Sequence, residues 1–144
     1  MLYVKEYIFR GRRRARGKER RITLLVTLCA AVILLVAADL ISKAAAVSVL
    51  SQTGGALEFI PGLIRFEYHK NTGMAWGLFS NATWVFVAIT IVTGGLIVFI
   101  LLKTLKTMPR NLQLGLALVL SGAIGNLIDR VALGYVRDML YFKL

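Results

Sequence analysis

The chain has 144 residues, 58% of which are hydrophobic, and a formal net charge of +11. This length allows one domain at most, and the apolar content exceeds the roughly 45–50% of soluble domains. Nine of the 18 Lys and Arg residues precede position 22, so the charge is a terminal feature rather than a surface for nucleic acid. The composition therefore predicts a membrane protein with no nucleic-acid partner.

Residues 1–21 contain the run GRRRARGKERR, which is too charged to bury a core. Basic segments beside a membrane span collect on its cytoplasmic side, where anionic lipids attract them. We therefore predict a disordered or interfacial cytoplasmic arm over 1–21 and a membrane domain over 22–144. Because two more apolar spans follow the first, we expect the first to be retained rather than cleaved as a leader peptide.

The first predicted span runs from about residue 22 to 41 and contains Cys29, a lone thiol that supports neither a disulfide framework nor a metal site. At about 1.5 Å per residue, a helix that starts at Arg21 brings Asp39 near the far interface. Two interpretations stay open. Asp39 is either a charge at a helix end that pairs with Lys43, four residues later, or a support for a site at that depth.

Residues 44–81 are predicted to form a long loop on the far side of the membrane. β-prone runs such as LIRFEYH indicate a small sheet at the membrane surface. Asn71 offers both donors and acceptors, and Gly73 allows close backbone approach, so this turn is a candidate part of a site. His69, the single histidine, is expected to be a surface loop residue rather than a ligand.

The second predicted span, 83–102, carries no charge, and the basic residues after it predict that the next loop is cytoplasmic. The third span runs from about residue 111 to 128. Ser121 and Gly125 lie four residues apart in it and give it a small-residue face for close helix packing. Asp129 follows and reaches the same interface as Asp39.

The carboxylates at this interface are the candidates for chemistry. No serine lies beside a plausible base and metal-ligand spacing is absent, so we expect no metal and no cofactor. Two nearby carboxylates share one proton, so one acts as base and the other as acid on a water molecule. Asp129 and Asp138 are nine residues apart and lie on opposite faces of a continuous helix. They meet only if the chain breaks at Gly134, which we do not favour.

Three motifs occur in order along the chain: AADLISK at 37–43, HKNTGMAWG at 69–77 and SGAIGNLIDRVALGYVRD at 121–138. In these motifs the chain resembles the bacterial lipoprotein signal peptidases (signal peptidase II), which are aspartic endopeptidases of the cytoplasmic membrane. The resemblance implies an all-α membrane fold of four transmembrane helices, three of them present here, with a small extracytoplasmic β-cradle between the first and second. It further implies a monomer that removes signal peptides from diacylglyceryl-modified prolipoproteins at the extracytoplasmic face, in contact with membrane lipid.

By the same resemblance, Asp138 in GYVRD matches the first catalytic aspartate. The residues that match supporting and substrate-holding positions of the family are Asp39, Asn71, Gly73, Asn126, Asp129 and Arg130. Three residues depart from the usual pattern in tolerable ways: Ser121, Trp76 and Arg137, the last of which replaces an apolar residue.

The second catalytic aspartate of the family lies in an FNxAD-like motif that opens the fourth helix, and this sequence does not contain it. We therefore expect a fragment of the enzyme, with Asp129 as the fallback for the second carboxylate. The alternative is a non-catalytic membrane protein that binds lipidated peptides or a partner. A small transporter that uses Asp39 and Asp129 as an ion relay is a third interpretation.

Overall fold

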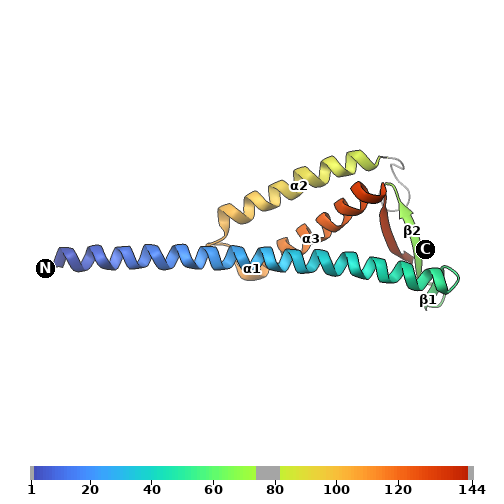
Figure 1. Cartoon of the computed structure of the whole chain (residues 1–144), viewed down its shortest axis with the longest axis horizontal. Coiled ribbons are helices and arrows are strands. Elements are labelled where there is room, and N and C mark those ends of the chain that lie inside the picture. The colour runs from blue at the N-terminus through green and yellow to red at the C-terminus, as the bar shows by residue number, and fades with distance from the viewer. Residues whose placement is uncertain (1, 74–81, 143–144) are drawn as a thin grey trace.

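Three helices and one small antiparallel sheet make up the structure, a computed structural model that describes residues 2–73 and 82–142, with side chains over 16–73 and 82–141. Figure 1 shows helices α2 and α3 lying along one half of the long helix α1, with the sheet across the end of the three helices. The predicted combination of membrane helices with a small sheet is confirmed. In chain order the elements are α1 (Leu2–Gln52), β1 (Ala56–Ile60), β2 (Ile64–Asn71), α2 (Thr83–Thr104), α3 (Arg110–Leu133) and β3 (Val136–Phe142).

Each of the three helices contains a stretch that is long and apolar enough to cross a membrane: Arg16–Gln52, Thr83–Thr104 and Arg110–Leu133. Their outward faces are apolar, and Ile33, Leu34 and Val92 expose 67%, 69% and 71% of their surface. Such faces suit lipid rather than water, because acyl chains are as apolar as these side chains. The three helices overlap the predicted spans, and each helix is longer than the span predicted within it.

Two predicted boundaries of the first helix were wrong, because α1 extends further at both ends. Residues 2–21, for which a disordered or interfacial arm was expected, are helical, and residues 44–52, expected in a loop, continue the same helix. The reason is local: Ala, Arg, Lys, Leu and Glu are strong helix formers, and each of the two interior glycines, Gly11 and Gly17, costs only about 1 kcal/mol. The helix ends where Gly54 and Gly55 adopt positive φ angles of 81° and 95°, and the Gly55 N–H donates to the carbonyl of Leu50 at 2.8 Å.

Helix α3 packs against both other helices and has more buried residues than either of them. At Gly125 a side chain would overlap the carboxylate of Asp39, whose Cγ lies 3.0 Å from the position of an added Cβ. Any larger residue here would have to displace the Asp39 carboxylate or separate α1 from α3, so this glycine suits the close approach of the two helices. At Gly115 and Gly122 an added Cβ would meet nothing within 4 Å, so the small-residue face makes its close contact only near its C-terminal end.

The sheet joins the segment after α1 to the segment after α3. Its strand order is β1-β2-β3, and both pairings are antiparallel. Helix α3 ends at Gly134, which has a φ of 85° and donates its N–H to the carbonyl of Arg130. The break at Gly134 that the sequence did not favour therefore occurs, and β3, which the sequence did not predict, follows it. His69 is exposed as expected but lies on β2, directly opposite Asp138, rather than in a loop.

Candidate active site

A lysine of α1 links the polar residues where α1 and α3 cross. Lys43 Nζ lies 2.8 Å from Oδ2 of Asp39, one helical turn earlier, and donates to Oδ1 of Asn126 at 2.9 Å. It also forms an ion pair with Asp129, with Nζ 3.4 Å from Oδ2. The predicted pairing of Asp39 with Lys43 is therefore confirmed, and the pair belongs to a cluster with Asp129. That Asp39 supports a site stays a prediction.

Asp129 is the most deeply buried charged residue among the described side chains, with 1% of its surface exposed. Arg137 donates to its Oδ1 through Nη2 at 2.6 Å and Nε at 3.1 Å, and the Arg137 backbone N–H donates to Oδ2 at 3.2 Å. These hydrogen bonds raise the pKa of Arg137 above its ordinary value. A buried carboxylate needs such partners, because an unpaired charge away from water is costly.

Asp138 lies in a different environment, although it directly follows Arg137. Asn71 pairs with Val136 across the sheet, so Asp138, two residues later on β3, shares its face of the sheet. Asn71 Nδ2 donates to Oδ2 of Asp138 at 2.6 Å, while Asn71 Oδ1 accepts the backbone N–H of Gly73 at 2.9 Å. Among the described side chains Asp138 forms no ion pair, whereas Asp129 forms two.

Arg130 connects α3 to the turn after β2. Its Nη2 donates to the carbonyl of Gly73 at 3.4 Å, and its guanidinium lies 5.2 Å from the centre of the Phe86 ring on α2. Its Nε is buried and has no hydrogen-bond partner among the described residues. Arg130 thereby brings α2, α3 and the Asn71 turn together beside the two carboxylates.

Two further contacts, which the sequence did not predict, hold the ends of the helices at the sheet. The hydroxyl of Tyr68 donates to the hydroxyl of Tyr135 at 2.9 Å, and this hydrogen bond, with burial, raises the pKa of Tyr68 to about 12. Thr83, the first residue of α2, donates to the carbonyl of Gly134 at 3.0 Å. No periodicity signals either contact, because each joins residues at least 50 positions apart.

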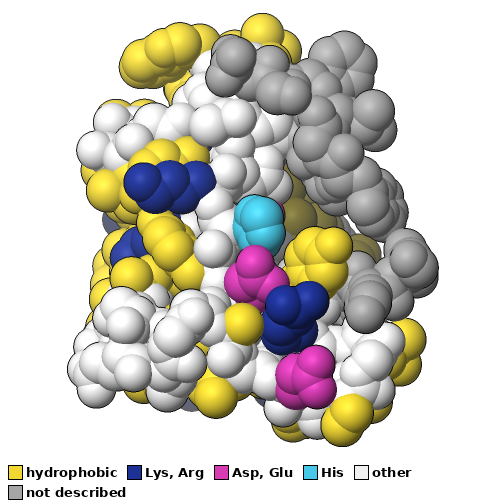
Figure 2. Space-filling view, turned by 90° about the vertical axis from the view of Figure 1, so that its right-hand side faces the viewer, with side chains coloured by type: hydrophobic (Ala, Val, Ile, Leu, Met, Phe, Trp, Pro, Cys, Tyr) yellow, Lys and Arg dark blue, Asp and Glu magenta, His cyan; other side chains and the backbone are white. Residues whose placement is uncertain are grey.

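Figure 2 shows the face of the molecule at this end, where acidic, basic and histidine side chains lie close together between apolar ones. Glu67 of β2 lies near both Arg65 and His69, with oxygen-to-nitrogen distances of 3.4 Å and 3.6 Å. These pairs are exposed, so they contribute little to stability compared with the Asp129 cluster.

The fold brings every residue predicted for the site to the same end of the molecule. Lys43 contacts Asp39, Asn126 and Asp129. A second group forms beside it, in which Asn71 donates to Asp138 and Arg130 donates to the carbonyl of Gly73. Two contacts were not predicted from the sequence. Lys43 contacts Asn126 and Asp129 on α3, and Arg137 is the main partner of Asp129. The i to i+4 spacing signals the pair of Lys43 with Asp39, but nothing in the sequence links Lys43 to residues 83 or more positions later. Residues 74–77 of the second motif, which include Trp76, lie outside the described residues.

Comparison with known proteins agrees with these motifs. The sequence model of the family described as Signal peptidase (SPase) II matches residues 31–144. The lipoprotein signal peptidase of Enterococcus faecalis is 44% identical over 107 residues, which cover 74% of this chain and 65% of that protein. The lipoprotein signal peptidase of Streptococcus pyogenes is 42% identical over 112 residues, which cover 76% of this chain and 70% of that protein. The chain thus spans about two thirds of the length of these relatives.

Solved structures show the same fold. A bacterial membrane enzyme solved at 2.3 Å resolution superposes with a TM-score of 0.65 and 29% sequence identity, over 81% of this chain and 70% of that one. A second, solved at 1.9 Å resolution, superposes with a TM-score of 0.61 and 30% identity, over 82% and 75% of the two chains. The family match covers the helices and the strands that carry all of the clustered carboxylates. The chain belongs to the signal peptidase II family.

Proposed function

We propose that this chain carries the membrane peptidase domain, residues 22–144, of an aspartic endopeptidase that removes signal peptides from diacylglyceryl-modified prolipoproteins. The observation that carries the proposal is the setting of Asp138. Its carboxylate is half-buried on a strand, oriented by a 2.6 Å hydrogen bond from Asn71, and forms no ion pair among the described side chains. A carboxylate in this setting is held in place yet can still exchange a proton with water.

The chemistry needs two carboxylates that share one proton. One carboxylate takes a proton from a water molecule as the water attacks the scissile carbonyl, and the other gives its proton to the reacting peptide. Asp138 is the first of these groups. Its neighbour Arg130 adds a positive charge beside the site, which stabilises negative charge that develops in the transition state.

Asp129 is better suited to a structural role than to that of the second carboxylate. Both of its oxygens accept hydrogen bonds from Arg137, and Lys43 pairs with it as well. An acid or base must change its charge during the reaction, and neutralising Asp129 would leave the Arg137 guanidinium partly unpaired. The second carboxylate is therefore expected on a further helix that begins with an Asn-x-Ala-Asp motif, as the resemblance implies.

We propose that the sheet end of the molecule is extracytoplasmic and that the N-terminal basic segment is cytoplasmic. The support is the separation of charge: the basic residues at 16–21 and at 103–110 lie at the end of the helices away from the sheet. Lys and Arg accumulate in cytoplasmic loops of membrane proteins. The site would then face the compartment in which exported prolipoproteins emerge.

The test is cleavage in membranes of a bacterial strain that lacks its own lipoprotein signal peptidase. The chain as it stands is compared with the same chain extended by a helix that starts with Asn-x-Ala-Asp, with a diacylglyceryl prolipoprotein as substrate. We expect the extended form to release the mature lipoprotein, and Asp138→Asn to reduce release to background. Glu58→Gln, the same carboxylate-to-amide change on an exposed strand of the sheet, is the matched control and should cleave normally.

Two outcomes would contradict the proposal. Cleavage that survives Asp138→Asn would remove Asp138 from the reaction. Failure of the extended form to cleave, while it folds and retains the lipidated substrate, would instead support the non-catalytic alternative in which the protein binds lipidated peptides.

A further inference from the structure

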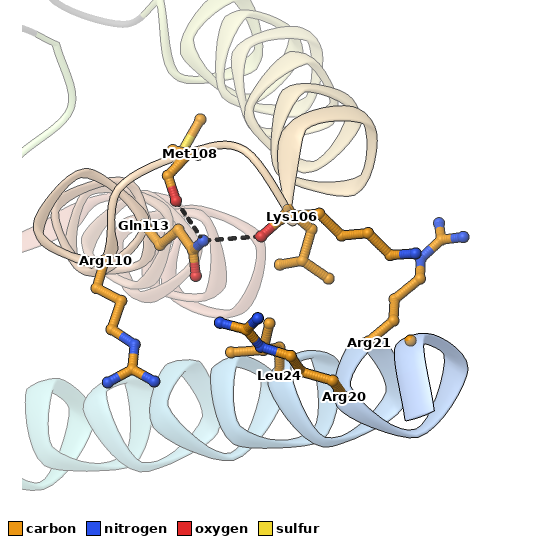
Figure 3. A pocket seen from close by; sticks show the side chains of 9 residues that line it. Arg20, Arg21, Leu24, Lys106, Met108, Arg110 and Gln113 are labelled. Atoms are coloured by element: carbon orange, nitrogen blue, oxygen red, sulfur yellow. Dashed lines mark hydrogen bonds between the residues drawn. The ribbon is translucent and has the colours of Figure 1, made fainter. Parts of the chain in front are cut away.

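A cavity of about 170 Å³ lies at the end of the helices far from the sheet, between α1 and the turn that connects α2 to α3. Four of its lining residues are basic: Arg20 and Arg21 on α1, and Lys106 and Arg110 at the connecting turn. They come from segments about 85 residues apart in the sequence, so the fold rather than a local charge run brings them together. Figure 3 shows the side chains of Arg21 and Lys106 extending toward each other across the cavity.

These like charges are not balanced by an ion pair within the described part of the chain. Among the residues whose side chains are described, no Asp or Glu forms an ion pair with any of the four. Cations that converge around one cavity repel each other unless an anion lies between them. The arrangement therefore fits a bound anion better than an empty site.

The cavity is held open by a buried polar side chain. Gln113 of α3 has 5% of its surface exposed, and its Nε2 donates at 2.9 Å to the carbonyls of both Leu105 and Met108. These bonds, drawn in Figure 3, fix the turn between α2 and α3. Because Lys106 and Arg110 lie within five residues of the bonded carbonyls, this turn also fixes their backbone positions. The basic groups are thus preorganised by the fold.

We propose that this cavity binds the phosphate headgroup of an anionic membrane lipid. Apart from Gly17 and Gln113, the rest of the lining is apolar, with Leu24, Leu105 and Met108 beside the basic groups. An amphiphile suits this mixture, because the phosphate meets the cations while the glycerol and upper acyl carbons meet the leucines and the methionine. Basic pockets between transmembrane helices on the cytoplasmic side are a recurring form of lipid headgroup site.

The position along the helices supports a lipid over a soluble anion. Helix α2 has 22 residues, or about 33 Å at roughly 1.5 Å per residue, which is close to the thickness of a bilayer core. The cavity at its C-terminal end therefore lies at headgroup depth. Its volume also far exceeds the roughly 10–15 Å³ that one water molecule requires. The site is about one membrane thickness away from Asp138 and is independent of the proposed peptidase function.

The experiment is native mass spectrometry of the full chain in detergent, titrated with phosphatidylglycerol, phosphatidylcholine or inorganic phosphate. We expect one phosphatidylglycerol to bind preferentially. The double variant Lys106→Gln/Arg110→Gln should bind it about 30-fold more weakly, given the contribution of each basic residue near anionic lipid. The matched control is Lys18→Gln/Lys103→Gln, which removes the same charge from the same end of the molecule but from residues that do not line the cavity.

Three results would overturn the proposal. Equal weakening in both double variants would mean that general surface charge, not the cavity, attracts the lipid. Equal binding of phosphatidylcholine would mean that the anionic headgroup is not recognised. Competition by inorganic phosphate at the concentration of the lipid would mean that the site takes a free anion. The thermal stability of each variant is measured alongside, and the Arg20→Gln/Arg21→Gln pair replaces the first variant if that variant does not fold.

Discussion

Arg137 reaches back from the start of β3 and binds Asp129 near the end of α3, with Nη2 at 2.6 Å and Nε at 3.1 Å from the same carboxylate oxygen. The next residue along the strand is Asp138. The ion pair therefore fixes the first residues of β3 relative to α3, and with them the backbone that carries Asp138. In the family pattern that this chain resembles, an apolar residue precedes the matching aspartate. In this chain Arg137 takes that place, and its ion pair with Asp129 anchors the strand instead.

Removing that anchor should destabilise the protein strongly. Asp129→Asn keeps the size of the side chain but leaves Arg137 and Lys43 without their shared counter-charge. Breaking a buried pair in this way costs about 3–5 kcal/mol. We expect a clearly lower melting temperature in detergent. Glu67→Gln, which removes a carboxylate from an exposed pair, should cost less than about 1 kcal/mol. Equal melting temperatures for the two variants would contradict this reading of Asp129.

Alanine substitutions at two glycines of α3 should change the stability of the protein in opposite directions. Gly125→Ala puts a Cβ onto the carboxylate of Asp39, so either the Asp39 side chain must leave its contact with Lys43 or α1 and α3 must separate, at a cost of about 1–3 kcal/mol. Gly122→Ala adds a Cβ where nothing lies within 4 Å and should stabilise the helix by about 0.5–1 kcal/mol. Unfolding of the two variants in detergent measures the difference. A stabilising Gly125→Ala would show that the helices do not approach at this point.

Asn71 should act as a positioning residue for Asp138. Asn71→Ala removes the 2.6 Å hydrogen bond to the carboxylate and also the acceptor for the Gly73 N–H. A hydrogen bond to a charged group contributes about 1.5–3 kcal/mol, so kcat/KM of the cleaving form should fall about 10- to 100-fold.

His69→Ala is the matched control for this prediction, because His69 lies on the same strand as Asn71, directly opposite Asp138 on β3, but is exposed. It should leave cleavage nearly unchanged. A loss that appears only in KM, with kcat unaltered, would assign Asn71 to substrate binding rather than to the orientation of Asp138.

The tyrosine pair predicts a change in alkaline titration. Hydrogen bonding to Tyr135 raises the pKa of Tyr68 to about 12, from an ordinary value of about 10. Because the folded state holds this proton more tightly, the stabilisation is complete below about pH 10 and is lost as the pH rises through about 12. Tyr135→Phe should lower the pKa of Tyr68, seen as phenolate absorbance at lower pH. Tyr141→Phe should leave that step in place.

The sequence predicted the three helices because long uncharged runs have few structural alternatives in a membrane. It also predicted the small sheet, because the residues at 64–71 are β-prone. It could not predict β3, since Val136–Phe142 reads equally well as the end of a helix until Gly134 adopts its positive φ. The hydrogen bond between Lys43 and Asn126 could not be predicted for a related reason. That contact exists only because Gly125 lets α1 and α3 meet, which is a tertiary property.

The pairing of β2 with β3 has a consequence for biosynthesis. The strand that holds Asn71 hydrogen-bonds to a strand about 70 residues later, and α2 and α3 are made between them. Helices in lipid gain little from hydrophobic association, so the sheet is a main tie between the first helix and the third. Residues 136–142 must therefore be synthesised and reach the same side of the membrane as residues 64–71 before Asp138 can contact Asn71. Until then Asp138 lacks its Asn71 partner, so the cluster at the sheet assembles only after the last strand is made.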